Sequence, residues 1–230
     1  MEVDVWRVDL CWVGARLEEA LKTLAPEEQE RARRFRFPAD RRRYLAAHCA
    51  LRMILARYLR AEPDSLRFSY SEFGKPELAL QHGFAPLRFN LSHSHELALV
   101  AVASERAVGV DVEYVRRDVR AAEIARRFFS PREAAALQSL EPERQDEGFF
   151  ACWTRKEAFT KARGQGLSHP LDQFDVDCTP GGLSCLLSTR PDPAEASRWT
   201  LLSLPVGPGY AAALAVYGRD PELRCWLWQS

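Results

Sequence analysis

The stretch Gly109-Val110-Asp111-Val112-Glu113 predicts a strand that carries two carboxylates. On a strand, residues i and i+2 point to the same face, so Asp111 and Glu113 lie side by side. Two neighbouring carboxylates repel each other, and the pair is costly without a cation beside it. Oxygen-only ligands with open positions suit magnesium, which takes one or two carboxylates together with phosphate oxygens. A solvated strand end would show the same pattern, so the stretch alone leaves both interpretations open.

A second stretch, from Trp153 to Lys161 (WTRKEAFTK), predicts a helix. At roughly 100° per residue, an arc of about 140° holds five of its side chains, Trp153, Lys156, Glu157, Thr160 and Lys161. The simplest interpretation is a surface pair between Glu157 and Lys161 at i, i+4. If this helix meets the strand, however, Glu157 joins Asp111 and Glu113 beside two lysines. Three carboxylates and two lysines then predict a hard metal ion and a polyphosphate.

Two loop motifs offer further phosphate contacts. Asn90-Leu91-Ser92-His93-Ser94 follows a short predicted strand, and both a hydroxyl and an imidazole can bind phosphate oxygens. A serine hydrolase is the competing idea, but the chain has no Gly-x-Ser-x-Gly elbow, and neighbouring Ser92 and His93 on a strand point to opposite faces. The turn Phe73-Gly74-Lys75-Pro76 places a ring next to a cation, which suits a nucleotide base and a phosphate as well as a plain turn.

The composition excludes several classes of protein. The 230 residues have a formal net charge of zero and are 47% hydrophobic, which argues against a nonspecific nucleic-acid or membrane binder and for a packed core. No stretch is long enough to span a membrane, and the first residues lack the basic region of a signal peptide, so we expect a cytoplasmic protein. The six cysteines are scattered, and we expect them to be reduced and buried.

Helical periodicity and strand alternation together predict an α+β fold. Predicted strands cover residues 2–13, 66–70, 87–91, 96–103, 107–113, 174–178, 183–188, 199–204 and 210–217. Predicted helices cover residues 16–24, 26–35, 38–60, 120–129, 131–140 and 146–162. Proline is well placed at the first turn of the helices that start at residues 26, 38 and 131. Ser130-Pro131-Arg132-Glu133 is also a capping box, which gives Glu133 a complete structural explanation.

A faint internal repeat accompanies this pattern. Ala32-Arg33-Arg34-Phe35 precedes Pro38 by the same interval at which Ala125-Arg126-Arg127-Phe128 precedes Pro131. Internal similarity of this kind indicates a duplicated unit. We therefore expect two similar α+β halves in one chain, with residues 1–106 as the N-terminal half and residues 107–230 as the half that carries the magnesium site.

Taken together, the motifs resemble the 4′-phosphopantetheinyl transferases, of the longer type that activates surfactin synthetase. Beyond the stretches already quoted, the resemblance rests on Arg126-Arg127-Phe128-Phe129-Ser130 and Gly164-x-Gly166-Leu167, in the family's order and spacing from about residue 26 to 177. The resemblance implies two similar halves in a pseudo-twofold arrangement and, because the chain is twice the size of the shorter synthases, a monomer. It also implies coenzyme A in the cleft between the halves. Its phosphopantetheine arm would move to a serine of an apo acyl or peptidyl carrier protein, releasing adenosine 3′,5′-bisphosphate.

The resemblance also assigns roles to residues. Asp111, Glu113 and Glu157 would hold magnesium with the pyrophosphate, and Glu157, or a metal-bound water that it orients, would take the proton of the carrier serine. Lys161, helped by Lys156, would bind the leaving phosphate and complete the catalytic set. The other coenzyme A contacts would come from Arg31, Arg43, Lys75, Ser92 and His93.

One departure from the family concerns the 3′-phosphate, because Glu28 stands where relatives often have a basic residue one turn before Arg31. A non-catalytic module that binds coenzyme A or a carrier protein is the alternative of a different class. Another magnesium-dependent phosphoryl-transfer enzyme is a third possibility, and it would act without a carrier protein.

Overall fold

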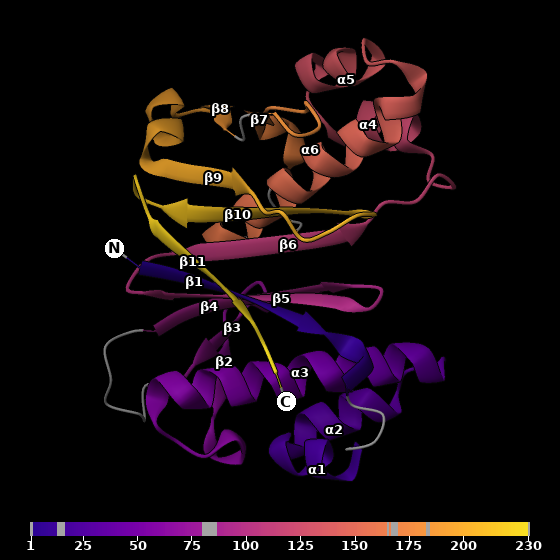
Figure 1. The fold of residues 1–230 in the computed structure, drawn as a ribbon. Helices are drawn as coiled ribbons and strands as arrows, with labels where there is room; N and C mark the ends of the chain where they lie inside the picture. The colour runs from indigo at the N-terminus through magenta and orange to yellow at the C-terminus, as the bar shows by residue number, and fades with distance from the viewer. Residues whose placement is uncertain are drawn as a thin grey trace.

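The computed structural model describes residues 2–12, 17–79, 87–164, 166, 170–182 and 185–229. Four layers follow one another through the molecule: a helical layer, two sheets that face each other, and a second helical layer (Figure 1). The predicted α+β fold is therefore confirmed. Position 167 of the Gly164-x-Gly166-Leu167 motif lies outside the described residues.

The first half contains one long helix under a four-stranded sheet. Along the chain it consists of β1 (Glu2–Asp9), α1 (Leu17–Thr23), α2 (Pro26–Arg33), α3 (Pro38–Leu59), the 3-10 helix η2 (Pro63–Ser65), β2 (Phe68–Tyr70), β3 (Pro76–Leu78), β4 (Leu87–Ser94) and β5 (Leu97–Ser104). The strand order of its sheet is β11-β1-β5-β4, and β2 and β3 form a separate hairpin. The strand β11 (Glu222–Leu227) comes from the far end of the chain and pairs in parallel with β1.

The second half repeats this plan with a three-stranded sheet of order β6-β10-β9. Its elements are β6 (Val108–Tyr114), α4 (Ala121–Phe128), α5 (Pro131–Gln138), α6 (Pro142–Arg163), the 3-10 helix η5 (Leu171–Gln173), β7 (Phe174–Val176), β8 (Leu186–Thr189), the 3-10 helix η6 (Pro193–Arg198), β9 (Trp199–Ser203) and β10 (Tyr210–Tyr217).

The helices α3 and α6 are each 22 residues long and begin with a proline at the first turn. Proline suits this position because the first N–H groups of a helix have no partner within the helix. Each helix ends on a residue in the left-handed region, Arg60 with φ 50° after α3 and Gly164 with φ 70° after α6. This conformation closes the last turn of a helix.

The two sheets are held together by an apolar core made from alternate residues of their strands. Val3 and Val5 of β1 meet Val108, Val110 and Val112 of β6 in one buried cluster. The opposite faces of the two sheets pack on their own helices and form two further clusters. Because side chains of a strand alternate, the valines of β6 turn toward the other half while Gly109, Asp111 and Glu113 turn toward α6.

Most predicted elements are confirmed, while the register of the repeat is wrong. The long helix that corresponds to α3 begins at Pro142, whereas Pro131 begins the short helix α5, which corresponds to α2. The strands β3 and β11 were not predicted. The division between residues 106 and 107 stays a prediction, and β11 returns from the second half to the sheet of the first. All six cysteines are free, but Cys11 and Cys225 are exposed, so the prediction that all are buried is wrong.

Candidate active site

The residue Gly109 allows α6 to lie directly on β6. A Cβ atom at Gly109 would come within 2.2 Å of the carbonyl oxygen of Ala158 and 2.3 Å of the backbone nitrogen of Ala162. Only a residue without a side chain fits so close an approach of two backbones. The next residue on the same face of β6 is Asp111, and the close approach brings it to Lys161 on α6.

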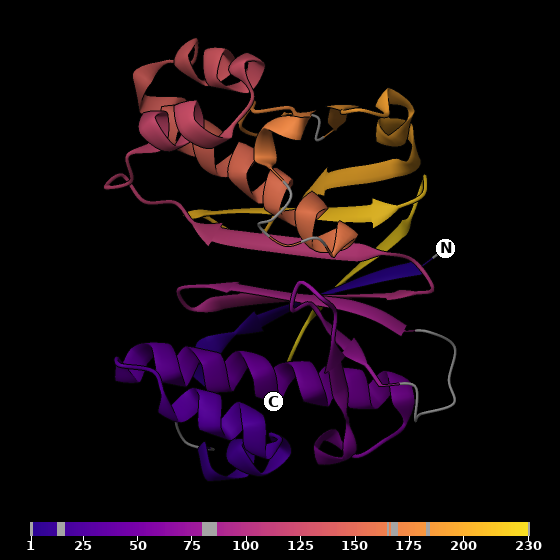
Figure 2. The same ribbon diagram turned by 180° about the vertical axis from the view of Figure 1, so that it is seen from behind.

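The strand β4 is joined to β6 by side chains in place of backbone pairing. The backbone N–H groups of Val110, Val112 and Tyr114 donate to alternate side chains of β4, namely Asn90 Oδ1 at 2.8 Å, Ser92 Oγ at 3.4 Å and Ser94 Oγ at 3.1 Å. The two strands lie side by side in both views of the fold (Figures 1 and 2). This ladder carries Ser92 and His93 from the first half to the acidic strand of the second.

The carboxylate of Asp111 lies at the centre of the resulting cluster and is buried. Its Oδ1 accepts hydrogen bonds from Lys161 Nζ at 2.6 Å and from Ser92 Oγ at 2.8 Å. The ammonium of Lys161 also donates to Ser92 Oγ at 3.0 Å. On the next residue of this face, Glu113 Oε2 accepts from Ser94 Oγ at 2.8 Å. Each carboxylate of β6 is therefore held by a serine of β4.

Two carboxylate oxygens of the cluster remain unpaired although they are buried. They are Asp111 Oδ2 and Glu157 Oε1. Burial, followed by the charges of Asp111 and Glu113, raises the pKa of Glu157 to about 7, while Lys161 acts in the opposite direction. Burial also raises the pKa of Glu113, and Asp111 adds to this effect. The cluster therefore has more negative charge than Lys161 compensates, and buried acceptors of this kind are costly unless a cation or donor joins them.

These residues fit a hard divalent cation by their chemistry. All three predicted ligands, Asp111, Glu113 and Glu157, offer oxygen atoms, and two of these oxygens have no other partner. Carboxylate oxygens with room for water and phosphate are typical of magnesium sites. In the structure the oxygen atoms of these three carboxylates do not all lie within 4.8 Å of one another, so they do not form a compact set of metal ligands. Within the described ranges, only another group, Glu133, Cys152 and Cys178, brings three ligand-type atoms within 4.8 Å of one another.

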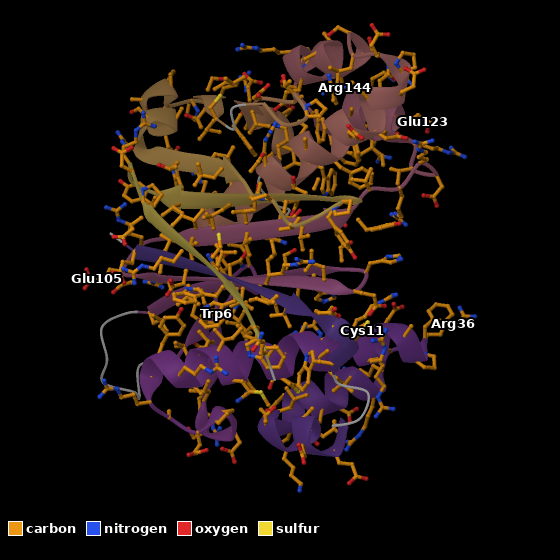
Figure 3. All side chains as sticks on the ribbon, viewed as in Figure 1. Trp6, Cys11, Arg36, Glu105, Glu123 and Arg144 are labelled. Atoms are coloured by element: carbon orange, nitrogen blue, oxygen red, sulfur yellow. The ribbon has the colours of Figure 1, made fainter. Side chains whose placement is uncertain are left out.

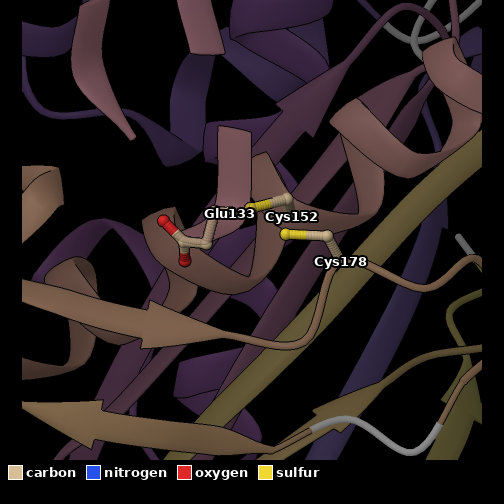
Figure 4. Close-up of side chains that lie close together, drawn as sticks. All are labelled: Glu133, Cys152 and Cys178. Carbon is tan, nitrogen blue, oxygen red and sulfur yellow. The ribbon is translucent and has the colours of Figure 1, made fainter. Parts of the chain in front are cut away.

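That other group does not suit a metal (Figure 4). Both oxygens of Glu133 are occupied: Oε1 accepts from the backbone N–H of Val176 at 2.8 Å, and Oε2 accepts from that of Ser130 at 3.0 Å and pairs with Lys156 Nζ at 2.8 Å. Burial raises the pKa of the Cys152 thiol well above its ordinary value, which disfavours the thiolate that a metal needs. The predicted capping role of Glu133 is confirmed.

The predicted role of Lys156 in catalysis and coenzyme A binding is wrong. Its side chain is fully buried and points into the second half, away from the acidic cluster. Besides Glu133, the ammonium donates to the carbonyl oxygens of Leu171 at 2.6 Å and Phe174 at 2.7 Å. All three of its donors are therefore used inside the fold. The sequence could not separate Lys156 from Lys161, because both fit the same broad arc of the helix.

The cluster opens into a pocket of about 370 Å³. Three strand residues of β4, two of β6 and three residues of α6 line it: Leu91, Ser92, His93, Asp111, Glu113, Trp153, Glu157 and Lys161. Trp153 is held in place by stacking on Phe149, with ring centres 5.9 Å apart. The predicted strand, helix and Ser-His motif thus meet at one place, as the sequence suggested.

Three further residues predicted to bind coenzyme A, His93, Arg43 and Arg31, differ in their surroundings. His93 lies at the wall of the pocket and is exposed. Arg43 Nη2 and Nε both bind Glu96 Oε1, at 2.9 and 3.0 Å. Arg31 is exposed, and its guanidinium lies 5.7 Å from the ring centre of Tyr44. Neither arginine lines the pocket.

The departure at Glu28 has a structural cause. Its carboxylate is buried, binds Arg52 Nε at 2.6 Å and lies 3.3 Å from His48 Nδ1. It also accepts the backbone N–H of Ala25 at the start of α2. Glu28 therefore anchors α2 to α3 and is not available to a ligand.

Lys75 does not offer a free cation to a ligand, which corrects its predicted role. Its ammonium donates to the backbone carbonyl oxygens of Lys161 at 2.7 Å, Val108 at 3.1 Å and Ala162 at 3.4 Å. Burial lowers the pKa of Lys75 to about 8. The neighbouring Phe73 is exposed and remains able to contact a ligand.

Sequence reasoning missed three residues that build the pocket. Asn90 and Ser94 belong to the ladder between β4 and β6, and Gly109 sets the distance between β6 and α6. The alternation of Asn90, Ser92 and Ser94 was a usable signal, because three polar side chains on one face of a strand need partners. The glycine inside the strand was a second signal, since it marks a close backbone approach.

Comparison with known proteins assigns both halves of the chain to one family. The profile of the 4′-phosphopantetheinyl transferase superfamily matches residues 107–215, and the profile described as "4′-phosphopantetheinyl transferase, N-terminal" matches residues 13–106. The 4′-phosphopantetheinyl transferase HetI of Nostoc sp. is 39% identical over 226 residues, which cover 98% of this chain and 92% of that protein. The transferase Sfp of Bacillus subtilis is 32% identical over 207 residues, which cover 89% of this chain and 88% of that protein.

Among solved structures, a holo-[acyl-carrier-protein] synthase of Thermotoga maritima overlaps 50% of this chain and 64% of its own, with a TM-score of 0.39 and 23% identity. The likeness to HetI extends over nearly the full length of both proteins and includes the strand, the helix and the Ser-His segment that form the pocket. The chain belongs to the 4′-phosphopantetheinyl transferase superfamily.

Proposed function

We propose that the protein transfers the 4′-phosphopantetheine moiety of coenzyme A to a serine hydroxyl of an apo acyl or peptidyl carrier protein, with release of adenosine 3′,5′-bisphosphate. One observation supports this most strongly. Asp111, Glu113 and Glu157 line one pocket with Lys161, and two of their buried oxygens have no partner. A module that only binds has no need of three carboxylates that destabilise one another.

The transfer forms one bond and breaks one. The carrier serine oxygen attacks the phosphorus that bears the pantetheine arm, and the bond from this phosphorus to the bridging oxygen breaks. Magnesium, held by Asp111, Glu113 and Glu157, would neutralise charge on the phosphoryl oxygens. Glu157, or a metal-bound water that it orients, is the candidate base for the proton of the carrier serine.

Lys161 is placed to bind the leaving phosphate. Its ammonium stands at the pocket with 28% of the side chain exposed, and Asp111 and Ser92 fix its position. A positioned cation stabilises the charge that develops on the leaving group. Ser92 and His93 extend this contact from the first half. Arg31 and Arg43 remain our candidates for the 3′-phosphate, and Arg43 would then have to exchange its bonds with Glu96 for bonds to the ligand.

The second candidate function is a non-catalytic module that binds coenzyme A or a carrier protein. It would use the basic residues proposed to bind coenzyme A, His93, Arg31 and Arg43, and would leave Glu157 without a role. The raised pKa of Glu157 argues against it, because an unused buried carboxylate only destabilises the fold.

The test is to incubate the protein with coenzyme A, magnesium and a panel of apo carrier proteins and to measure intact masses. We expect at least one carrier to gain one phosphopantetheine group per serine site, and only when magnesium is present. Coenzyme A binding without an adduct on any carrier would favour the binding module. Hydrolysis of coenzyme A or another nucleotide without a carrier would favour a different phosphoryl-transfer enzyme.

The oligomeric state, the further partners and the location of the protein remain predictions. We expect a monomer, because both halves of the fold lie in one chain, with no nucleic-acid or membrane partner and a cytoplasmic location. In the described residues, none of the helices has the length and apolar character to cross a bilayer.

A further inference from the structure

The hairpin of β2 and β3 turns at Ser71–Lys75 and reaches across to the second half. The backbone N–H of Ser71 donates to the carbonyl oxygen of Lys75 at 2.9 Å, and that of Gly74 to the carbonyl oxygen of Ser71 at 2.9 Å. Ser71 Oγ accepts the backbone N–H of Lys75 at 3.1 Å. Gly74, with φ 77°, supplies the left-handed residue that the turn requires. The turn is thus rigid, and it holds the Lys75 side chain toward the second half.

The three acceptors of Lys75 come from two different elements. Val108 opens the strand β6, whereas Lys161 and Ala162 belong to the last turn of α6. The carbonyl groups of a last helical turn have no partner within the helix and carry partial negative charge. One ammonium therefore closes the end of α6 and ties it to the start of β6.

The same turn also packs on the glycines that follow α6. A Cβ atom at Gly164 would lie 3.6 Å from Lys75 Cδ, and one at Gly166 would lie 3.5 Å from Phe73 Cβ. Both glycines have positive φ, 70° and 58°. Two separate sequence motifs, Phe73-Gly74-Lys75-Pro76 and Gly164-x-Gly166, are therefore parts of one contact between the halves.

This contact lies next to the ion pair of the candidate active site. β6 carries Asp111 three residues after Val108, and α6 presents Lys161, whose own carbonyl oxygen Lys75 binds. The pair Lys161–Asp111 spans the same two elements at 2.6 Å. A separation of the end of α6 from β6 would displace Lys161 relative to Asp111.

We propose that Lys75 is a positioning residue: it clamps the last turn of α6 to β6 and so keeps the Lys161 ammonium on Asp111 and at the leaving phosphate. Its ammonium acts through Lys161, because its three hydrogen bonds all go to backbone carbonyl oxygens of the fold. This role rests on the proposed transferase function, but the clamp itself can be measured without any substrate.

The kinetic test compares Lys75→Met with the wild type. Methionine keeps the length of the side chain and removes all three donors. We expect kcat to fall about tenfold to a hundredfold, because small displacements of a positioned group have effects of this size. Binding of adenosine 3′,5′-bisphosphate should weaken in parallel, because Lys161 holds the leaving phosphate, and this loss should be absent when Lys75→Met is made in a Lys161→Met background. A kcat of Lys75→Met within about twofold of the wild type would overturn the proposal.

A double-mutant cycle tests whether the effect passes through Lys161. In a Lys161→Met background, the further change Lys75→Met should lower kcat by less than about twofold. A full additional loss would contradict a role that passes through Lys161. Lys75→Arg, which keeps a cation and donors, should recover a large part of kcat, and no recovery would show that charge and donors are not what matters.

Amide hydrogen exchange of the ligand-free protein measures independently how firmly Lys75 holds the last turn of α6. In Lys75→Met, exchange of the last turn of α6, residues 160–164, should become at least several-fold faster, while the buried strand β5 stays unchanged. Equal exchange rates in variant and wild type would disprove the clamp. Lys22→Met is the matched control, because Lys22 is an exposed lysine in the last turn of α1. If the wild type modifies no carrier but the exchange result holds, the proposed function fails and the clamp stands.

Discussion

The helices α3 and α6 are anchored in their halves by the same kind of buried ion pair. At the same position of the two helices stand Arg52 and Lys156, both almost fully buried. Arg52 binds Glu28 at 2.6 Å, and Lys156 binds Glu133 at 2.8 Å. Each glutamate also accepts the backbone N–H that precedes a short helix beginning with proline, α2 or α5.

The remaining donors of the two cations are used alike. Arg52 donates to the carbonyl oxygens of Pro63 and Leu66, around η2, and lies 5.0 Å from the ring centre of Phe68. Lys156 donates to carbonyl oxygens at either end of η5 and lies 4.2 Å from the ring of Phe174. The anchor is therefore duplicated in full, although the cation differs.

The difference begins one residue later on each helix. Met53 on α3 corresponds to Glu157 on α6. On the strand below, Asp4 and Trp6 of β1 face α3, and Asp4 accepts hydrogen bonds from Tyr58 Oη and Trp226 Nε1. Trp226 stacks on Trp6, with ring centres 5.6 Å apart, where β11 pairs in parallel with β1. Trp6 is labelled in Figure 3.

The two halves thus show how a strand carboxylate with a structural role differs from those of the candidate active site. In the first half, aromatic side chains satisfy the strand carboxylate, and β11 covers the strand edge. In the second half, the edge of β6 faces β4, and Asp111 and Glu157 each keep an unpaired oxygen. The candidate active site lies where buried carboxylates keep an oxygen without a partner, whereas the anchoring ion pairs are common to both halves.

The largest expected effect comes from removing the carboxylate that only α6 carries. Glu157→Gln should lower kcat/KM for transfer by about 10² to 10⁴, the usual range for loss of a general base. Its counterpart Met53→Gln, in the first half, should change kcat/KM by less than about twofold at a temperature where both are folded. The measurement is the initial rate of carrier modification followed by mass. Transfer at the wild-type rate in Glu157→Gln, or in Asp111→Ala, would end the assignment of the acidic cluster.

Breaking the anchors should lower stability and leave the chemistry of the folded protein intact. Lys156→Met leaves Glu133 buried without its cation and should lower the free energy of unfolding by about 3–5 kcal/mol. Arg52→Met should cost less, because His48 remains 3.3 Å from Glu28. Urea denaturation measures both values. A Lys156→Met protein that keeps its stability but no longer transfers the arm would restore a catalytic role to Lys156.

The pH dependence of the free energy of unfolding should also distinguish Glu157 of the second half from its counterpart Met53 in the first. Burial and the neighbouring carboxylates raise the pKa of Glu157 from 4.5 to about 7, so the metal-free folded protein binds a proton that the unfolded chain has released. Its free energy of unfolding should therefore fall as pH rises from about 4.5 to about 7 and stay lower above that.

Thermal unfolding in the presence of a chelator at pH 5 and pH 8 measures this effect. Glu157→Gln should raise the melting temperature at pH 8 by a few degrees and leave it unchanged at pH 5, while Met53→Gln should show no such pH dependence. Magnesium at pH 8 should stabilise the wild type more than Glu157→Gln. Equal magnesium stabilisation of both proteins would remove Glu157 from the ligands.

The smallest effect on function should come from replacing His93, which the first half contributes to the pocket. His93→Ala should raise the dissociation constant of coenzyme A by about tenfold, the value of one hydrogen bond to a charged group, and leave kcat nearly unchanged. Calorimetry of coenzyme A binding measures it. Unchanged affinity would contradict the phosphate contact of His93 and leave the first half with a structural role only.

The sequence predicted the fold class, most elements and the meeting of Asp111, Glu113, Glu157 and Lys161 in one pocket with Ser92. These succeeded because strand and helix periodicities fix which side chains share a face. Lys156 was misassigned because a helix of this length is buried on more than one side, so an arc of side chains does not say which of its edges faces the pocket. Lys75 was misassigned because its partners are backbone carbonyl groups, which leave no trace in side-chain patterns.

The strand β11 could not be predicted from the sequence for a different reason. Its residues alternate weakly, and nothing local indicates that it pairs with a strand at the other end of the chain. The register of the internal repeat was also wrong, because the matching Arg-Arg-Phe segments precede different kinds of helix. Only the long helices, with their buried Arg52 and Lys156, align the halves correctly.

The pairing of β1 with β11 has a consequence for how the protein is made. Trp226 binds Asp4 across a sequence separation of 222 residues, and Glu2 is opposite Glu222 in the sheet. A ribosome synthesises the chain from its first residue, so β1 waits for its edge partner until the whole second half has been translated. During that time the edge of β1 and the ring of Trp6 are uncovered, and unpaired strand edges attract other chains. The strand that completes the first sheet, β11, is thus synthesised after every strand of the second half.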